Sequence, residues 1–186
     1  MEIKPKLWLD IDDVVVSTSE FLKRRMISMF GEKWNSEENI WDLTPEMSSQ
    51  EYLSGMVSGM LDYGDIPFVD GFLENLEEVR TMYDITLLSR CSFGSAERRV
   101  KEELGKMLNL PVVCLTNCEK KGLYAIGGVQ VDDRLSELKD SFADVTILFN
   151  NDKTGCDGVW KYPTKNVRNW GDLTESLRYF KGRLYS

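Results

Sequence analysis

Five short apolar runs alternate with segments of helical periodicity, and this alternation constrains the fold more than any other feature of the chain. The runs lie at 6–10, 85–88, 112–115, 129–131 and 145–149. Apolar runs of this length predict buried strands. None shows the strict apolar–polar alternation of a sheet with one solvated face. Because strands that alternate with helices form a parallel sheet covered on both faces, we predict an α/β fold with a Rossmann-like, doubly wound parallel sheet.

The helical segments are predicted from caps and from apolar spacing. Ser17, Thr18 and Ser19 offer caps for a first helix that Gly31 can end. Further helices are expected over 71–81, from Ser95 with an apolar stripe, through Leu135 and Leu138, and over 172–180. The stripe after Ser95 consists of Ala96, Val100, Leu104 and Leu108. The stretch between the last predicted strand and the last helix, rich in Asn, Asp and Gly, is expected to be a loop.

One region departs from the strand–helix pattern. The segment from Trp34 to Gly64 is rich in Trp, Met, Ser and Glu and contains no strand pattern. The chain of 186 residues is long enough for one domain with a modest insertion. We therefore expect an α/β core formed by 1–14 and 68–186, with a small helical cap over 15–67 inserted after the first strand.

Composition excludes several classes of function. The chain has no His, which removes Ser-His-Asp and Cys-His systems, HExxH zinc sites and His general bases. The net charge of −8 argues against binding a nucleic-acid polymer, because such binding neutralises phosphates. No secretory signal and no membrane-spanning run are recognised, so we expect a cytoplasmic protein with reduced thiols. Its oligomeric state is left open.

A zinc site is a weaker alternative. Cys114 and Cys118 have a spacing that zinc could use, and only Cys91 and Cys156 could add further thiolates. We favour the simpler interpretation that Cys114 and Cys118 are two thiols at the end of a buried strand.

Polar residues follow the predicted strands where those strands end. Asp10, Asp12 and Asp13 follow the first, Ser89 and Arg90 the second, and Asp132 and Asp133 the fourth; Lys120 and Lys121 come soon after the third. Each group alone is more typical of a turn, a cap or a solvated surface. Ligands of open parallel sheets bind beyond the carboxyl ends of the strands, so together these groups are candidates for one site. Paired carboxylates there favour Mg²⁺, and a hydroxyl with an ammonium can hold phosphate.

This order of motifs resembles the haloacid dehalogenase superfamily of phosphohydrolases. The matching phrases are Asp10-Ile11-Asp12-Asp13-Val14, Leu87-Leu88-Ser89, Lys120-Lys121 and Val131-Asp132-Asp133-Arg134. Within it, the chain is most similar to the 5'(3')-deoxyribonucleotidase group. The similarity to that group rests on 66–71, 131–134, 147–150 and 167–173. The resemblance implies a Mg²⁺-dependent phosphomonoesterase that acts on (deoxy)nucleoside monophosphates through an aspartyl-phosphate, and a small cap domain after the first motif.

The resemblance also implies roles for single residues. Asp10 would be the nucleophile, and Asp12 would protonate the leaving oxygen and later activate water, in surroundings that favour the neutral acid. Mg²⁺ would be bound by Asp10, the backbone carbonyl of Asp12, and Asp132. Asp133 would lie behind these ligands or replace one of them. The family's Gly-Thr after the second acid is Asp13-Val14 here.

Phosphate contacts are implied in the same way. Ser89 would hold a phosphate oxygen, and Lys121, or failing that Lys120, would pair with the phosphate and the nucleophile. Arg90 follows Ser89 and either touches phosphate or points outward. A nucleobase would need aromatic faces, for which Phe21 and Trp41 are the chosen candidates. Others are Trp34, Tyr52, Tyr63 and Phe68, most of which we expect to pack the cap's own core.

Two alternatives remain beside this function. A phosphatase of another small metabolite would use the same chemistry. A non-catalytic relative that binds nucleotide would keep the fold without turnover.

Overall fold

Six parallel strands form one sheet in the order β3-β2-β1-β4-β5-β6. The structure is a computed structural model that describes residues 4–30, 65–91, 95–116, 118–149 and 165–185. Its strands are β1 (Lys6–Leu9), β2 (Asp84–Arg90), β3 (Val112–Leu115), β4 (Val129–Asp132), β5 (Val145–Phe149) and β6 (Lys165–Val167). This strand order is that of the doubly wound Rossmann fold. The predicted fold class is therefore confirmed.

Five of the six strands coincide with the predicted apolar runs, and β6 was missed. Its three residues bury only Val167, so it carries no apolar run to detect. It pairs with the buried strand β5 through Ile147↔Lys165 and Phe149↔Val167. Pairing at the edge of an existing sheet, rather than its own sequence, makes this segment a strand.

The described helices are α1 (Thr18–Phe30), α3 (Phe72–Met82), α4 (Ser95–Leu108), α5 (Lys121–Tyr124), α6 (Leu135–Leu138) and α7 (Trp170–Leu184). All except α5 were predicted, although α7 begins two residues earlier and ends four residues later than 172–180. The four-residue α5 is too short to show periodicity.

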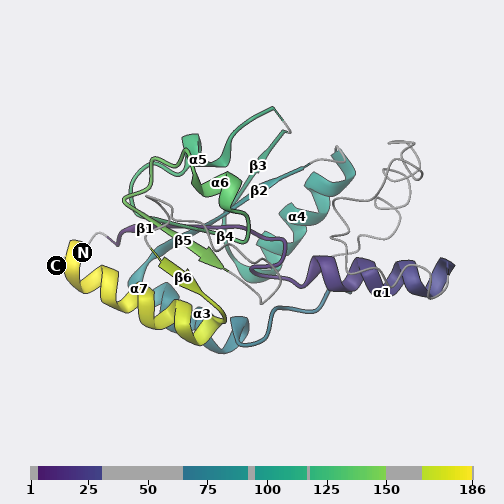
Figure 1. The fold of residues 1–186 in the computed structure, drawn as a ribbon, viewed down its shortest axis with the longest axis horizontal. Coiled ribbons are helices and arrows are strands. Elements are labelled where there is room, and N and C mark those ends of the chain that lie inside the picture. Colours follow the sequence, from purple (N-terminus) through teal and green to yellow (C-terminus); the bar gives the residue numbers. More distant parts are fainter. Residues whose placement is uncertain (1–3, 31–64, 92–94, 117, 150–164, 186) are drawn as a thin grey trace.

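Alternate side chains of the strands enter two separate cores. Leu7 and Leu9 of β1 belong to the larger core with residues of α3, α4 and α7, whereas Trp8 packs on the smaller one. The smaller core lies on the other face, with Leu88, Leu115 and Ala125 at its centre. Figure 1 shows α3 and α7 below the sheet and α5 and α6 above it. Burial on both faces explains why the strands read as continuous apolar runs.

The buried face of α4 differs from the predicted stripe. Among the described side chains of α4, Glu97, Lys101, Leu104 and Leu108 are buried, and they recur at helical spacing. Val100, placed on the stripe from sequence, is only half-buried against the core. Leu104 and Leu108 of the predicted stripe are thus buried as expected, and the helix also turns two charged side chains inward beside them.

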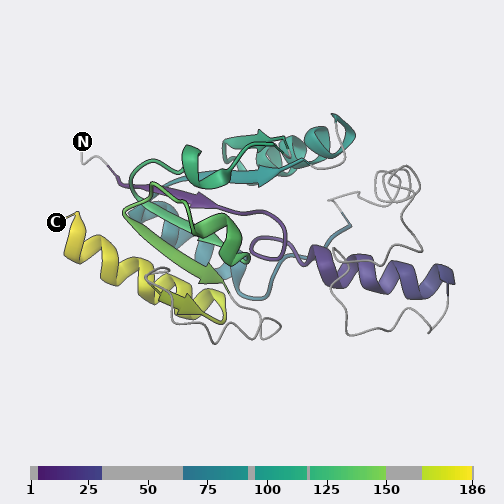
Figure 2. The same ribbon diagram turned by 45° about the horizontal axis from the view of Figure 1, so that its top comes forward.

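The two ends of the predicted cap pack into the core. Val15, Val16 and Leu22 are buried there, and so is Ile66. A bridge between Val16 and Phe68 joins the two ends of this segment. Helix α1 then projects beyond the end of the sheet (Figure 2). Residues 31–64, which carry most of the predicted cap, lie outside the described residues. Within the described part of the chain, no helix combines the length and the apolar character needed to cross a bilayer.

Candidate active site

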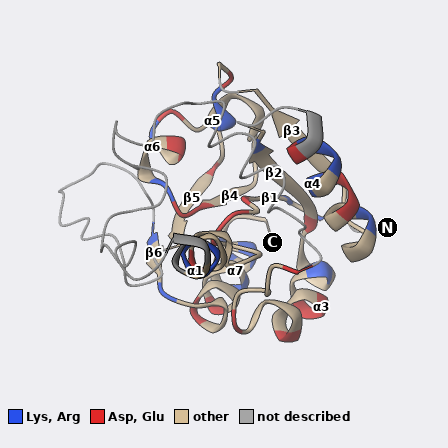
Figure 3. Ribbon diagram, turned by 90° about the vertical axis from the view of Figure 1, so that its right-hand side faces the viewer, with Lys and Arg blue, Asp and Glu red and all other residues tan. Residues whose placement is uncertain are grey.

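Two aspartates lie side by side at the carboxyl edge of the sheet because β1 and β4 are neighbours. Asp10 directly follows β1, and its backbone N–H donates to the carbonyl of Val131, 3.0 Å away. Asp132 is the last residue of β4. Both are buried, with 4% and 1% of their surface exposed. Between β1 and β4 the strand order changes direction, which is where doubly wound sheets bind ligands. Figure 3 views this edge, with acidic residues in red.

A buried lysine joins these two carboxylates. The Nζ of Lys121 lies 2.7 Å from Oδ1 of Asp10 and 2.9 Å from Oδ2 of Asp132. Burial alone would lower the pKa of Lys121, but the charges of Asp10 and Asp132 raise it above its usual value. Lys120, in contrast, is exposed on the surface, where its Nζ lies 2.6 Å from Oδ2 of Asp140. The geometry therefore places Lys121, and not Lys120, beside the aspartates.

Asp133 completes a group of three carboxylates. Oxygens of Asp10, Asp132 and Asp133 lie within 4.8 Å of one another. Burial raises the pKa of Asp132 to about 7, although the Lys121 ammonium opposes this shift. Burial and the charge of Asp132 also raise the pKa of Asp133. Crowded carboxylates of this kind gain from a cation between them, and an oxygen donor set of this charge fits a hard ion such as Mg²⁺. The donor set therefore fits the predicted metal.

The side chain of Asp12 turns away from that group. Thr18 Oγ1 donates to its Oδ1 at 2.8 Å, and the Lys101 Nζ lies 2.7 Å from its Oδ2. Both oxygens of the carboxylate are thus held. The Lys101 ammonium therefore lies directly beside one oxygen of the carboxylate. Of the predicted metal ligands, only Asp12 does not contribute its carboxylate to the acidic group.

Ser89 lies next to Asp12, but the side chain of Arg90 turns elsewhere. Ser89 is buried in β2, and its Oγ accepts a hydrogen bond from Lys101 Nζ at 2.8 Å. Arg90 pairs with Glu137 of α6 at 3.0 Å. The structure thus brings Ser89 to the site, whereas the Arg90 side chain is held against α6.

Lys101 is the site residue that the sequence analysis missed. It is fully buried in α4, with Glu97 one turn earlier on the same face, 2.8 Å away. Burial alone would lower the pKa of Lys101, but the charges of Asp12 and Glu97 raise it above the usual value. The available signal was spacing, because residues 97, 101, 104 and 108 share one face of a helix. Two charged residues on the face of Leu104 and Leu108 are uncommon unless they are paired.

The backbone at Asp13 adopts a conformation that few residue types tolerate. Asp13 has φ of 58°, in the left-handed region where glycine is favoured and Asp is tolerated. Its carboxylate accepts a hydrogen bond from the backbone N–H of Ser19 at 2.9 Å. Burial raises the pKa of Asp13. The side chain thus fastens the loop after Asp12 to the start of α1, which a glycine could not do.

Two of the aromatic candidates for substrate contact, Phe21 and Phe68, lie within the described residues. Phe21 of α1 is half-buried against the larger core, and the Arg25 guanidinium lies 5.3 Å from its ring centroid. Phe68 packs on Phe72 at 5.3 Å between ring centroids. The remaining candidates, Trp34, Trp41, Tyr52 and Tyr63, lie outside the described residues.

The three described cysteines form no comparable group. Cys91 is buried, Cys114 is half-buried and Cys118 is exposed, and Cys156 lies outside the described residues. Over the ranges that the structure describes, the one group able to hold a metal contains aspartates alone. That group lies at the site predicted for Mg²⁺.

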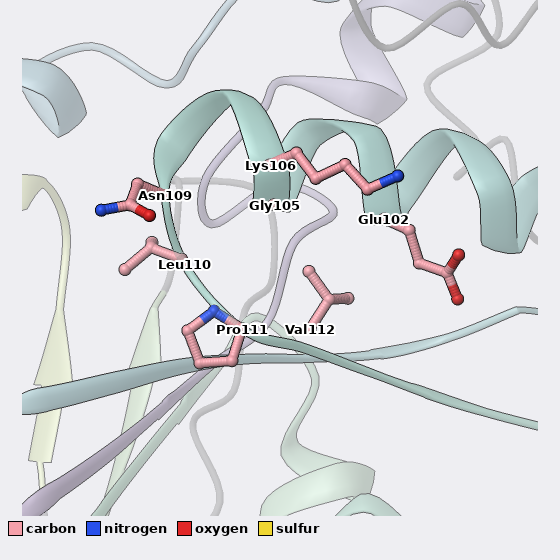
Figure 4. A pocket seen from close by; sticks show the side chains of 7 residues that line it. All are labelled: Glu102, Gly105, Lys106, Asn109, Leu110, Pro111 and Val112. Carbon is pink, nitrogen blue, oxygen red and sulfur yellow. The ribbon is translucent and has the colours of Figure 1, made fainter.

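A surface hollow lies at the amino end of β3, away from the carboxyl edge of the sheet that carries the aspartates. It is lined by Glu102, Gly105, Lys106, Asn109, Leu110, Pro111 and Val112, at the end of α4 and the start of the strand (Figure 4). Ser89 pairs with Cys114, which is further along the same strand. The hollow is therefore separate from the aspartates and Ser89.

Comparison with solved structures finds the same fold in hydrolases of the haloacid dehalogenase type. YfnB from Bacillus subtilis, a proposed HAD-hydrolase solved bound to magnesium, is 12% identical with a TM-score of 0.58, covering 95% of this chain and 99% of that one. A haloacid dehalogenase-like hydrolase from Xanthomonas campestris is 12% identical with a TM-score of 0.60, covering 98% and 100%. An apo phosphoserine phosphatase is 14% identical with a TM-score of 0.54, covering 95% and 98%.

At these identities the similarity concerns the fold. No protein-family profile matches the sequence, and no curated protein matches it.

Proposed function

We propose that this chain is a Mg²⁺-dependent phosphomonoesterase of the haloacid dehalogenase type. The observation that carries the proposal is the position of Lys121 between the buried carboxylates of Asp10 and Asp132, at 2.7 and 2.9 Å. Such an arrangement suits a carboxylate that attacks an anionic phosphate, because nearby cations offset the repulsion between the two. The magnesium-bound neighbour of the same fold supports the choice of metal.

The chemistry consists of two displacements at phosphorus. A carboxylate oxygen of Asp10 attacks, the bond from phosphorus to the ester oxygen breaks, and the Asp12 carboxyl gives its proton to the leaving oxygen. The Asp12 carboxylate then takes a proton from a water that attacks the aspartyl-phosphate, which releases inorganic phosphate and free Asp10. Ser89 and Lys121 hold phosphate oxygens. Bound Mg²⁺, held by Asp10, Asp132 and the backbone carbonyl of Asp12, would supply Lewis-acid stabilisation of the phosphate charge.

Removal of the nucleophile tests this proposal. Asp10→Asn keeps the size of the side chain but removes its nucleophilic charge, so phosphate release should fall by at least about 1,000-fold. The matched control is Asp84→Asn, which makes the same change at the exposed amino end of β2. Persistent turnover in Asp10→Asn, with Asp84→Asn normal, would contradict the proposed nucleophile.

The metal can be tested without turnover. Mg²⁺ that binds only the folded protein should raise its melting temperature. Asp132→Asn should abolish this response, because it removes one of the three crowded carboxylates, and EDTA should abolish phosphate release. An equal Mg²⁺ response in wild type and Asp132→Asn would contradict the assignment of this site.

For the substrate, we propose nucleoside monophosphates, deoxy forms first, on the resemblance of the sequence to the deoxyribonucleotidase group. A panel of 5'- and 3'-(deoxy)nucleotides and sugar phosphates tests this. The phosphoserine phosphatase of the same fold favours one second candidate, a phosphatase of another small metabolite. Turnover of phosphoserine or sugar phosphates, without nucleotides, would keep the chemistry and replace the substrate.

A further inference from the structure

Lys101 is a completely buried cation that the chemistry above does not use. Its exposed fraction is 0%, and four of the oxygen atoms near its Nζ come from β2, from α4 and from the loop after β1. These are Asp12 Oδ2 at 2.7 Å, Ser89 Oγ at 2.8 Å, Glu97 Oε1 at 2.8 Å and the Arg90 carbonyl at 2.6 Å. Taking an ammonium out of water is costly, and buried ion pairs are poor sources of stability. The burial of Lys101 is therefore explained better by a role in the site than by a contribution to the stability of the fold.

The two buried lysines contact different residues of the site. Lys121 contacts the nucleophile Asp10 and the metal-side Asp132. Lys101 instead links Asp12 to Ser89, the groups proposed for proton transfer and for phosphate binding. Because α4 starts soon after β2 ends, its second turn returns over that strand's carboxyl end. This places the Lys101 ammonium between residues that are 77 positions apart in the sequence.

The contact with Ser89 fixes the direction of its hydroxyl. Lys101 donates to Ser89 Oγ, so the hydroxyl hydrogen must find another acceptor. Asp12 Oδ2 and the Arg90 carbonyl lie 3.4 and 3.5 Å from that oxygen, which is too long for a strong O–H···O bond. The hydroxyl hydrogen can therefore donate to a phosphate oxygen, and the ammonium holds the Ser89 oxygen in place for this.

The contact with Asp12 fixes the plane of its carboxylate. One oxygen accepts from Thr18 and the other from Lys101, so rotation about the last side-chain bond would break one of two short bonds. A proton donor or acceptor must be held in this way to meet the reacting oxygen. The protein supplies the second of these bonds from a helix outside the motif that contains Asp12.

We propose that Lys101 is a positioning residue that orients both the Asp12 carboxylate and the Ser89 hydroxyl toward the phosphate ester. This inference rests on the proposed phosphomonoesterase function. It predicts that the effect of losing Lys101 depends on Asp12 in turnover and on Ser89 in phosphate binding.

The first test is a double-mutant cycle on turnover. Lys101→Met should lower kcat/KM by about 100-fold, the range for a misplaced acid–base group. In an Asp12→Asn background, the same substitution should lower kcat/KM by no more than about tenfold, because the acid–base group that it orients is already gone and only its effect through Ser89 is left. The matched control is Lys106→Met, on the exposed side of the same helix, which should leave kcat/KM unchanged. An equal loss in both backgrounds would show a merely structural role and overturn the proposal.

The second test measures binding of inorganic phosphate by calorimetry and needs no turnover. Lys101→Met and Ser89→Ala should each weaken binding by about tenfold, and the double variant no further. Unchanged affinity in Lys101→Met would overturn the orientation of Ser89. If wild type binds phosphate but hydrolyses no ester, the proposed function fails while this test still decides the role of Lys101.

Removing Lys101 alone takes away the ammonium that pairs with the buried Glu97 carboxylate, and this can unfold the protein. Lys101→Met with Glu97→Gln removes that charge as well and serves as the second variant. Its melting temperature should return toward wild type, while kcat/KM and phosphate affinity stay low. Recovery of both functions in this folded variant would overturn the proposal.

Discussion

Replacing Trp170 by Phe should destabilise the protein by about 2–4 kcal/mol. Trp170 is fully buried at the start of α7, and its Nε1–H donates to the Val14 carbonyl at 2.8 Å. Val14 is also fully buried, so its carbonyl would lose a partner that water cannot replace, at about 1–3 kcal/mol. The benzene ring is roughly 40 Å³ smaller than the indole, and a cavity of that size adds about 1 kcal/mol.

Urea unfolding followed by circular dichroism measures this, because the loss of one Trp does not disturb that signal. The matched control is Trp8→Phe, whose half-buried Nε1–H donates to Gly127 at 3.3 Å. That change should cost about 1 kcal/mol or less, since water can reach the carbonyl. Equal costs for the two variants would refute the reasoning. Val14 lies two residues after Asp12 in the same loop, so we also expect reduced kcat/KM in Trp170→Phe.

Two further predictions concern stability alone. Burial raises the pKa of Tyr83 to about 12, above its unfolded value of about 10. The contribution of the protonated Tyr83 hydroxyl to stability is therefore complete below pH 10, and about 1–2 kcal/mol of it is lost as the pH rises toward 12. Denaturant unfolding at each pH measures this decline in stability, and Tyr83→Phe should remove the part that comes from Tyr83. Gly128 has φ of 70°, and an added Cβ would lie 2.1 Å from the Lys6 carbonyl oxygen. Gly128→Ala should thus destabilise the protein by about 2–4 kcal/mol in thermal unfolding. The control Gly182→Ala, with open space around it, should be neutral or slightly stabilising. Similar melting temperatures for the two variants would contradict this prediction.

Local pattern was sufficient for most of the fold. A strand buried on both faces needs an apolar run, and 145–149 shows one with the bounds of β5. Helix α4 was likewise predicted from Ser95 to Leu108. Elements too short or too polar for such a pattern, such as β6 and α5, form because neighbouring elements hold them. No local pattern in the sequence could have predicted either.

The site divides in the same way. The sequence alone places Asp10, Ser89 and Asp132 at the carboxyl ends of strands, and a parallel sheet must bring such residues to one edge. It did not decide between Lys120 and Lys121, because adjacent residues differ in burial only once α5 is packed against its neighbours. Nor did it identify Lys101, whose importance depends on which face of α4 meets the sheet. Tertiary packing alone decides that face, and with it the charge that lies beside Asp12.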